Sequence, residues 1–254
     1  MFKKLYQYRE LLKSNIKKEI RGKYKGSFLG VLWSFVNPLL MTLVYAIVFP
    51  FILKGAQEHY TTYIVIGILP WNFFTTVISQ GTFTILGNGG IIKKIYFPRE
   101  ILPISVATSG LVNFLISFPI ICLFLVFSGI GFSLSILWIP IVIITEYIFV
   151  LAIIFITSSI NVYIRDFEYI VNFLIQMLFY ATPVLYSSDL FGSKGWILKL
   201  NPMTTIIESY RDILFYQQLP NISHLLIVLS GSIILLFIGI NVFKKLEKGF
   251  AEEL

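Results

Sequence analysis

Long stretches without a charged side chain restrict the fold of this chain more than any other feature of its sequence. The longest covers residues 101–145, where 45 consecutive positions hold no Asp, Glu, Lys or Arg. A helix that crosses the hydrocarbon core of a bilayer needs about 20 apolar residues. This stretch is therefore long enough for two crossings, and the turn between them is predicted at residues 129–131, Gly-Ile-Gly.

The composition agrees with a protein that lies in lipid. Hydrophobic residues make up 57% of the 254 positions and charged residues only 13%, whereas soluble domains have about 25% charged residues. An ordinary soluble enzyme is thus disfavoured, and disorder is excluded because it needs low hydrophobicity and high charge. At this length we expect one domain, residues 1–254.

The uncharged stretches predict an all-α integral membrane protein with six transmembrane helices. Pro140 lies near the start of the fourth helix and Glu146 interrupts it, while the sixth follows a turn at Pro220 and Asn221. The predicted spans cover about residues 28–53, 60–86, 102–128, 136–162, 169–187 and 223–243.

Residues 1–27 are predicted to form an amphipathic interface helix. They carry nine Lys or Arg and no apolar core, so they do not read as a secretory signal peptide. Apolar side chains recur at three- or four-residue spacing and share one helical face. Such a helix lies on the membrane surface; the alternative is a solvated helix that packs on a partner, and both can hold. The apolar face consists of Leu5, Tyr8, Leu12, Ile16 and Ile20.

Basic residues are distributed unevenly between alternate connecting segments, which predicts the orientation. Sixteen of the 20 Lys and Arg lie in residues 1–27, 87–100, 165–168 and 244–254. We therefore expect these segments, and both termini, in the cytoplasm. The net charge of +7 then faces anionic inner-leaflet lipid. No nucleic-acid-binding module is found, so nucleic acid is not an expected partner.

Two cytoplasmic connections are more patterned than a linker requires. In the first, a glycine-rich breaker precedes residues 91–100, which mix apolar and charged side chains. Pro98 forces an extended or turn conformation on Phe97, so we interpret this segment as a small docking element; the alternative is a basic membrane anchor. In the second, a tight turn, Arg165 and Asp166 are adjacent and are expected to pair with other cytoplasmic groups.

The outer segment, residues 187–221, has intermediate hydrophobicity. Asn201 and Pro202 divide it into two pieces that are too short and too charged to span a membrane. A re-entrant or interfacial helical hairpin is predicted, with a plain surface loop as the alternative. Glu208 and Arg211 are three residues apart, so they can pair on one helix.

Glu146 is the one carboxylate well inside a predicted span. A lone charge costs at least about 2.5–3.5 kcal/mol at that depth, so the group must be protonated, paired or turned to a protein interior. We expect a structural role, with a hydrogen bond to Ser, Thr or Asn of a neighbouring span.

No motif for catalysis or nucleotide binding is found in the sequence. It has no Gly-x-x-x-x-Gly-Lys-Ser/Thr loop and no His-Glu-x-x-His spacing. Cys122, His59 and His224 are too few for a disulfide or a metal cluster. An intramembrane serine protease would need a Gly-x-Ser-Gly turn, and a secondary transporter would show matched broken spans. We therefore expect another polypeptide to supply the active chemistry, and no cofactor or metal on this chain.

Four stretches together resemble the permease subunit of type-2 ABC exporters of cell-surface polysaccharide, a family that includes permeases for O antigen, capsule and teichoic acid. The resemblance covers nearly the whole chain, and the order and spacing of the stretches are more specific than any one of them. The stretches are RGKYKGSFLGVLW (21–33) with Asn37 and Pro38, GILPWNFF (67–74), residues 161–166 continuing to Gln176 and TPVLY (182–186), and NPM (201–203).

The resemblance implies a homodimer with two copies of an ATPase subunit in the cytoplasmic (inner) membrane, exporting a lipid-linked polysaccharide of the O-antigen or teichoic-acid type. ATP and Mg would bind the ATPase and not this chain. A two-fold dimer also suits the length, because six helices cannot comfortably enclose a sugar-wide pore. The alternatives are export of a drug or small lipid by the same fold and, less favoured, an intramembrane hydrolase.

The resemblance also implies roles for particular residues. Residues 91–100 would be a coupling helix seated in the ATPase, residues 187–221 would be outer re-entrant helices near the pore exit, and spans one and five would line the conduit. The implied ATPase-coupling residues are Lys94, Tyr96, Phe97, Pro98, Arg99, Glu100, Arg165 and Asp166. The implied conduit residues are Trp33, Tyr45, Phe173, Phe179 and Tyr180. The implied outer-gate residues are Asn201, Pro202, Glu208 and Arg211.

Overall fold

The computed structural model describes the chain except for residues 1–5, 25, 29 and 53–57. The described residues form helices and turns and contain no strand. The α-helices are α2 (Arg9–Tyr24), α3 (Trp33–Ile52), α4 (Tyr60–Gly87), α5 (Gly89–Ile92), α6 (Ile101–Phe127), α7 (Ile139–Tyr163), α8 (Phe167–Tyr180), α9 (Pro202–Leu214), α10 (Ile222–Leu246) and α11 (Phe250–Glu253). The 3-10 helices are η1 (Gly30–Leu32), η2 (Leu134–Trp138), η3 (Ser188–Leu200) and η4 (Glu247–Gly249).

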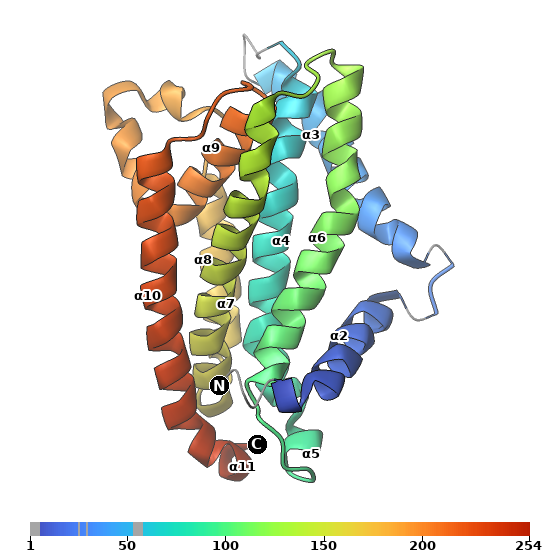
Figure 1. The fold of residues 1–254 in the computed structure, drawn as a ribbon, viewed down its shortest axis with the longest axis vertical. Helices are drawn as coiled ribbons and strands as arrows, with labels where there is room; N and C mark the ends of the chain where they lie inside the picture. Colours follow the sequence, from blue (N-terminus) through green and yellow to red (C-terminus); the bar gives the residue numbers. More distant parts are fainter. Residues whose placement is uncertain (1–5, 25, 29, 53–57) are drawn as a thin grey trace.

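Helix α4 lies at the centre of a bundle of long helices (Figure 1). It contacts α3, α6, α7, α8 and α9. Of its apolar stretch, 78% is buried, against 17% for the helical segment that begins at Ile222, at the edge of the bundle. Three consecutive residues, Ile64, Val65 and Ile66, are all fully buried. This is expected of a helix that is apolar on every side and enclosed by others.

Four helical segments of the described chain are long and apolar enough to cross a membrane: Tyr60–Gly87, Ile101–Phe127, Leu134–Tyr163 and Ile222–Glu253. The other two predicted spans fall on α3 and α8. Helix α8 has 14 residues, fewer than the about 20 that a crossing needs. The chain turns after Tyr180, just before Pro183, whose ring and missing N–H do not suit a helix interior. The count of six spans therefore stays a prediction.

The connection between α6 and α7 contains the two glycines expected in the turn. Gly129 and Gly131 adopt φ angles of 71° and 74°, a left-handed conformation that glycine reaches without steric cost. Pro140 lies in the first turn of α7, where its missing N–H is not needed. The third and fourth predicted spans are thus separated as the sequence indicates.

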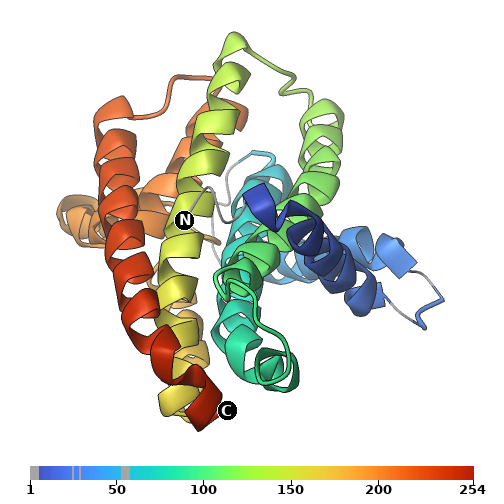
Figure 2. The ribbon, with the colours of Figure 1, turned by 60° about the horizontal axis from the view of Figure 1, so that its bottom comes forward.

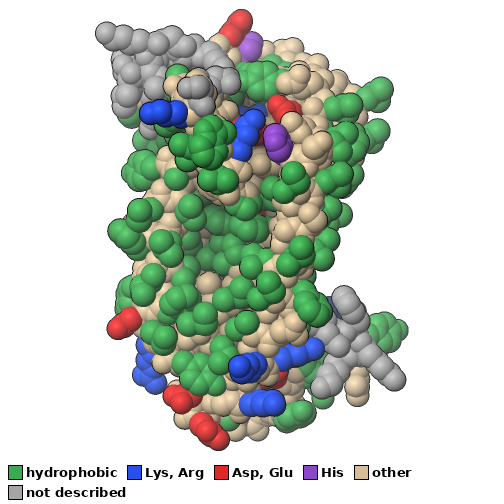
Figure 3. Space-filling view, turned by 90° about the vertical axis from the view of Figure 1, so that its left-hand side faces the viewer, with side chains coloured by type: hydrophobic (Ala, Val, Ile, Leu, Met, Phe, Trp, Pro, Cys, Tyr) green, Lys and Arg blue, Asp and Glu red, His purple; other side chains and the backbone are tan. Residues whose placement is uncertain are grey.

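The two ends of the bundle differ in the elements that cover them. Helices α2, α5 and α11 gather at one end, which Figure 2 brings forward, and α9 lies at the other (Figure 1). Between these ends, Figure 3 shows a belt of hydrophobic side chains, with charged side chains above and below it. A belt of this kind is typical of a protein that crosses a membrane.

Candidate transport path and its two ends

A groove with a volume of about 840 Å³ lies between α3, α4 and α6. Helix α4 presents Asn72, Thr76 and Gln80 to it, and α6 contributes Asn113 and Ser117. Polar side chains within membrane-spanning helices face the protein interior or a water-filled cavity, and they often mark substrate pathways. The groove is therefore a candidate path for a hydrophilic substrate.

These polar side chains are not among the residues predicted from sequence. The sequence contained a signal for them: Asn72, Thr76 and Gln80 are spaced by four residues on a helix without charged side chains, and so share one face. The space beside that face depends on how α3 and α6 pack, which the sequence pattern does not show.

Four of the five predicted conduit residues lie beside the groove or in a neighbouring aromatic cluster. Trp33 lines the groove. The ring centroids of Tyr45 in α3 and Phe179 in α8 are 6.5 Å apart, and those of Phe179 and Tyr180 are 5.5 Å apart. Trp71 of α4, which was not predicted, joins this cluster at 5.6 Å from Phe179.

Phe173, the fifth, belongs to an exposed apolar face of α8. Its side chain is 60% exposed. Neighbouring side chains on α3 are exposed as well, so that lipid or another protein must cover both helices. The exposed apolar residues are Tyr169, Ile170, Leu174, Met177 and Tyr180 on α8 and Leu39, Leu40, Met41, Leu43, Val44, Ile47 and Val48 on α3.

The connection after α4 differs from the predicted coupling helix of residues 91–100. Helix α5 covers only Gly89–Ile92, and the chain has no regular secondary structure at residues 96–98. Phe97 lies outside any helix, as predicted from Pro98, which disfavours helical geometry at the residue before it. The role of residues 91–100 as a coupling element stays a prediction.

Exposure divides the predicted coupling residues into two groups. Tyr96 is 88% exposed, and Lys94 is exposed beside it. Phe97 and Glu100, by contrast, are only 5% and 7% exposed and face the bundle, while Pro98 is half-buried. Ile95, which was not predicted, is 62% exposed and extends the accessible surface.

Arg99 joins this connection to the carboxyl-terminal segment. Its guanidinium donates a hydrogen bond to the backbone carbonyl of Glu247 and lies 5.9 Å from the ring centroid of Phe250. Phe250 is fully buried, and Tyr163 at the end of α7 donates its hydroxyl to the carbonyl of Leu246 at 2.8 Å. The carboxyl-terminal turn therefore bridges the connection after α4 and the end of α7.

Arg165 and Asp166 lie in the turn between α7 and α8 and are exposed. The described residues show no ion pair from either side chain. Asn161 steadies this turn, because its Oδ1 accepts the backbone N–H of Glu168 at 3.0 Å. The turn lies at the same end of the bundle as α5 (Figure 1).

Arg211 in α9 forms the buried centre of the outer end. Its side chain is 2% exposed, and it donates to the carbonyl of Pro183 and, at 2.5 Å, to that of Val184. The guanidinium carbon lies 3.6 Å from the ring centroid of Tyr63 in α4, a cation–π geometry. A Cβ atom on Gly67 would lie 2.7 Å from Arg211 Nη2, so the glycine makes room for the guanidinium.

Glu208 and Arg211, whose spacing allows a pair, do not form one in the structure. The described residues contain no ion pair between them, although both line the same cavity. Helical spacing allows the pair, but the guanidinium instead turns towards the backbone carbonyls of residues 183 and 184.

Asn201 and Pro202 determine where α9 begins. Asn201 Oδ1 accepts the backbone N–H of Met203 at 3.0 Å, which is the bond that an N-cap residue makes. Pro202 fills the first helical position, which suits its fixed φ angle. The Asn201 amide also donates to Thr182 Oγ1 at 2.7 Å, so the start of α9 is held against the end of α8.

Glu146 on α7 is fully buried. Its Oε2 accepts a hydrogen bond from the Tyr210 hydroxyl at 2.9 Å, and Oε1 has no partner in the described part of the chain. The expected partner, a Ser, Thr or Asn on a neighbouring span, was wrong, because the donor is a phenol on α9. Tyr210 and Arg211, adjacent on α9, thus anchor that helix to α7 and α4.

These features define an integral membrane protein with a polar groove inside an apolar belt. Within the described residues, no group of three or more His, Cys, Asp or Glu could hold a metal ion. The family model of the ABC-2 type transporter matches residues 10–215. The chain therefore belongs to the ABC-2 type transporter family, and its class is transporter rather than enzyme.

Two curated relatives match over almost their full length. The O-antigen export system permease protein RfbA of Klebsiella pneumoniae is 37% identical over 237 residues, which cover 92% of this chain and 91% of the relative. The protein of the same name from Myxococcus xanthus is 33% identical over 257 residues, covering 100% of this chain and 99% of the relative.

Proposed function

We propose that this chain is the permease subunit of an ATP-driven exporter that moves a lipid-linked cell-surface polysaccharide of the O-antigen type across the membrane. The two relatives described above are named as permeases of O-antigen export. The structural observation that supports this most is the row of Asn72, Thr76 and Gln80 in the groove. A hydrophilic polymer needs such hydrogen-bonding groups to pass through an apolar belt.

The proposed assembly is a homodimer with two ATPase subunits, which bind the ATP and Mg. The exposed apolar faces of α3 and α8 would pack against the second copy, so that the two helices serve as the first and fifth of six crossings. In such a dimer a two-fold axis relates the copies, and the path between them would include the groove of each copy. The half-buried rings of Tyr45 and Phe179 would offer flat apolar surfaces to passing sugars.

The end that carries α2, α5 and α11 would face the cytoplasm, with both termini on that side of the inner membrane. The concentration of basic residues in the segments at this end supports this orientation. Exposed Lys94, Tyr96, Arg165 and Asp166 would contact the ATPase. Closure of the ATPase pair would then reach the crossings as rigid-body movement.

Surface polysaccharide in cells tests this proposal. Deleting the gene should remove the polymer from the surface while lipid-linked polymer accumulates inside, and a plasmid copy should restore export. A chain with Asn72→Leu and Gln80→Leu should insert normally and fail to restore export, because the groove loses hydrogen-bonding groups at similar side-chain volume. Ser230→Leu, on an exposed side of α10, is the matched control.

Two results would overturn the proposal. Normal surface polysaccharide in the deletion strain would exclude this substrate, and increased sensitivity of that strain to small apolar toxins would favour drug or lipid export instead. Full export by the double leucine variant would exclude the groove as the path.

A further inference from the structure

A second cavity, with a volume of about 530 Å³, lies at the outer end of the bundle. Side chains from α4, η3, α9 and α10, and from the turn before α10, line it, and nearly all of them are polar or charged. Its volume falls within the about 300–1,000 Å³ of small-molecule sites. The groove in the membrane has a mixed lining with several leucine, valine and aromatic side chains, so the two spaces suit different ligands.

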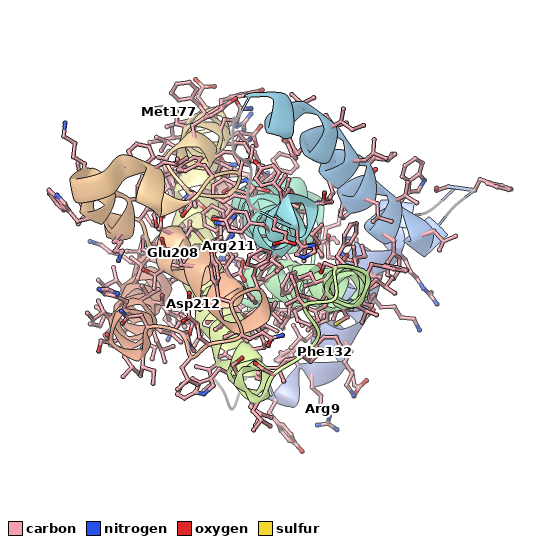
Figure 4. All side chains as sticks on the ribbon, turned by 90° about the horizontal axis from the view of Figure 1, so that it is seen from above. Arg9, Phe132, Met177, Glu208, Arg211 and Asp212 are labelled. Carbon is pink, nitrogen blue, oxygen red and sulfur yellow. The ribbon has the colours of Figure 1, made fainter. Side chains whose placement is uncertain are left out.

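Two carboxyl groups from α9 dominate this outer cavity. Glu208 and Asp212 lie one helical turn apart and both line it; Figure 4 labels them with Arg211, seen from this end. Burial raises the pKa of the Asp212 carboxyl, and the nearby Glu208 raises it further. A ligand that donates uncharged hydrogen bonds to these oxygens therefore fits better than an anion, which would add a third negative charge.

The buried arginine does not turn the cavity into an anion site. The guanidinium of Arg211 is already bonded to the carbonyls of Pro183 and Val184 and stacked on Tyr63. A phosphate would need that fork of donors. Lys199 also lines the cavity, but its side chain is exposed and shares the cavity with two carboxyl groups. The cavity is therefore less favourable for a phosphorylated headgroup than for a neutral ligand.

The chain before α10 bends back to complete the cavity. Gln217 adopts a φ angle of 56°, which is uncommon for a residue other than glycine. The next residue, Gln218, then donates its backbone N–H to the carbonyl of Asp212 at 2.8 Å. Asn221 Oδ1 accepts the backbone N–H of His224 at 3.1 Å, so its amide nitrogen can donate to a ligand.

We propose that this outer cavity binds one neutral sugar unit. Each sugar hydroxyl both donates and accepts hydrogen bonds, which matches the Glu208 carboxylate and the Asn221 amide. Asp212 already accepts from the Gln218 side chain and the Asn221 backbone, so a sugar would use its remaining lone pairs. Tyr216 is 44% exposed and offers an apolar ring to the C–H face of a sugar. The proposal rests on the proposed function in one respect only: the sugar is taken to be part of the exported polymer as it leaves the path.

Saturation-transfer difference NMR on the full chain in nanodiscs tests the subsite. The probes are D-glucose, D-galactose, D-mannose and L-rhamnose, with inorganic phosphate as competitor. We expect saturation transfer to at least one sugar, no displacement by phosphate, and affinity about tenfold weaker in Glu208→Gln and in Asp212→Asn, since each loses a hydrogen bond to a charged group. Glu252→Gln, an exposed carboxylate on α11, is the matched control and should bind as the unmodified chain does.

Three outcomes would overturn the subsite: no transfer to any of the four sugars, unchanged transfer in both cavity variants, or displacement of the sugar by phosphate. Failure here is separable from failure of the proposed function. If surface polysaccharide depends on the chain but no sugar binds, only the subsite is lost. If a sugar binds but deletion leaves the surface unchanged, only the exporter proposal is lost.

Discussion

Two arginines, one at each end of the bundle, connect loops to helices by the same pair of contacts at different depths. Arg211 at the outer end donates to two backbone carbonyls and lies 3.6 Å from the ring centroid of Tyr63. Arg99 at the other end donates to one carbonyl and lies 5.9 Å from the ring centroid of Phe250. Arg211 is 2% exposed, whereas Arg99 is half-buried.

The difference in depth gives the two ends different mechanical properties. Removing a buried donor leaves acceptors that water cannot reach, so the outer network separates only at high cost. The distance from the guanidinium to the ring is longer at Arg99 than at Arg211, and solvent reaches Arg99. The contact at Arg99 can therefore separate and re-form at a lower free-energy cost. This arrangement suits a transporter whose outer end holds its shape while the opposite end follows a motor subunit.

The largest loss of stability is expected from Arg211→Met. The carbonyls of Pro183 and Val184 lose their donors, and each orphaned buried acceptor costs about 1–3 kcal/mol, so we expect a total of about 2–5 kcal/mol. Unfolding in SDS or urea of the purified chain in detergent measures this. Arg211→Lys should recover only part of the lost stability, because an ammonium group lacks the planar pair of donors of a guanidinium. Lys199→Met is the control, and an unchanged midpoint in Arg211→Met would refute the network.

Gly67→Ala should lower the stability by a similar amount, although Arg211 itself is unchanged. The new Cβ atom would lie 2.7 Å from Arg211 Nη2 and 3.0 Å from the carbonyl oxygen of Val184, and such overpacking costs about 1–3 kcal/mol. Gly231→Ala in α10 is the matched control, because nothing lies within 4 Å of its Cβ position. Equal stability of the two variants, measured by the same unfolding midpoint, would contradict the close approach of α4 to Arg211.

A smaller loss is expected from Tyr210→Phe. This change removes the hydroxyl that donates to Glu146 Oε2 and keeps the ring, so we expect about 1–2 kcal/mol. Glu146→Gln should lose less, because an amide oxygen still accepts from the phenol. Tyr210→Phe, Glu146→Leu, which removes the acceptor, and the double variant form a cycle whose coupling energy measures the bond. Strict additivity would show that the bond contributes nothing.

The sequence predicted those parts of the fold that depend on local composition. Uncharged stretches located α4, α6, α7 and α10 to within a few residues, because one apolar helix needs no knowledge of its neighbours to be recognised. The glycines of the turn before α7 were recognisable for the same reason. Helix α8 was predicted too long, since its end depends on a turn that packs against α9.

The candidate sites depended on contacts that the sequence does not encode locally. The spacing on α9 allowed Arg211 a pair with Glu208, but its acceptors come from residues 183 and 184, more than 25 positions earlier. The same is true of Glu146, whose donor Tyr210 lies on another element. The polar groove needs three helices to enclose it, so a pattern on α4 alone could indicate a polar face and not a path.

A small change in stability is expected at Arg99. Arg99→Gln loses a cation–π contact worth about 0.5–1 kcal/mol at a partly exposed site, and Gln can still donate to the carbonyl of Glu247. Tyr96→Ala, at an 88% exposed side chain, should leave the unfolding midpoint unchanged.

Export of surface polysaccharide should rank these two variants in the opposite order. Tyr96→Ala removes an accessible side chain that is proposed to contact the ATPase, whereas Arg99→Gln only loosens an internal bridge to the carboxyl-terminal turn. If Arg99→Gln abolished export at wild-type stability and Tyr96→Ala did not, the bridge would itself transmit the movement. The cytoplasmic end would then resemble the outer end in depending on its arginine, and the mechanical contrast between the two ends would not hold.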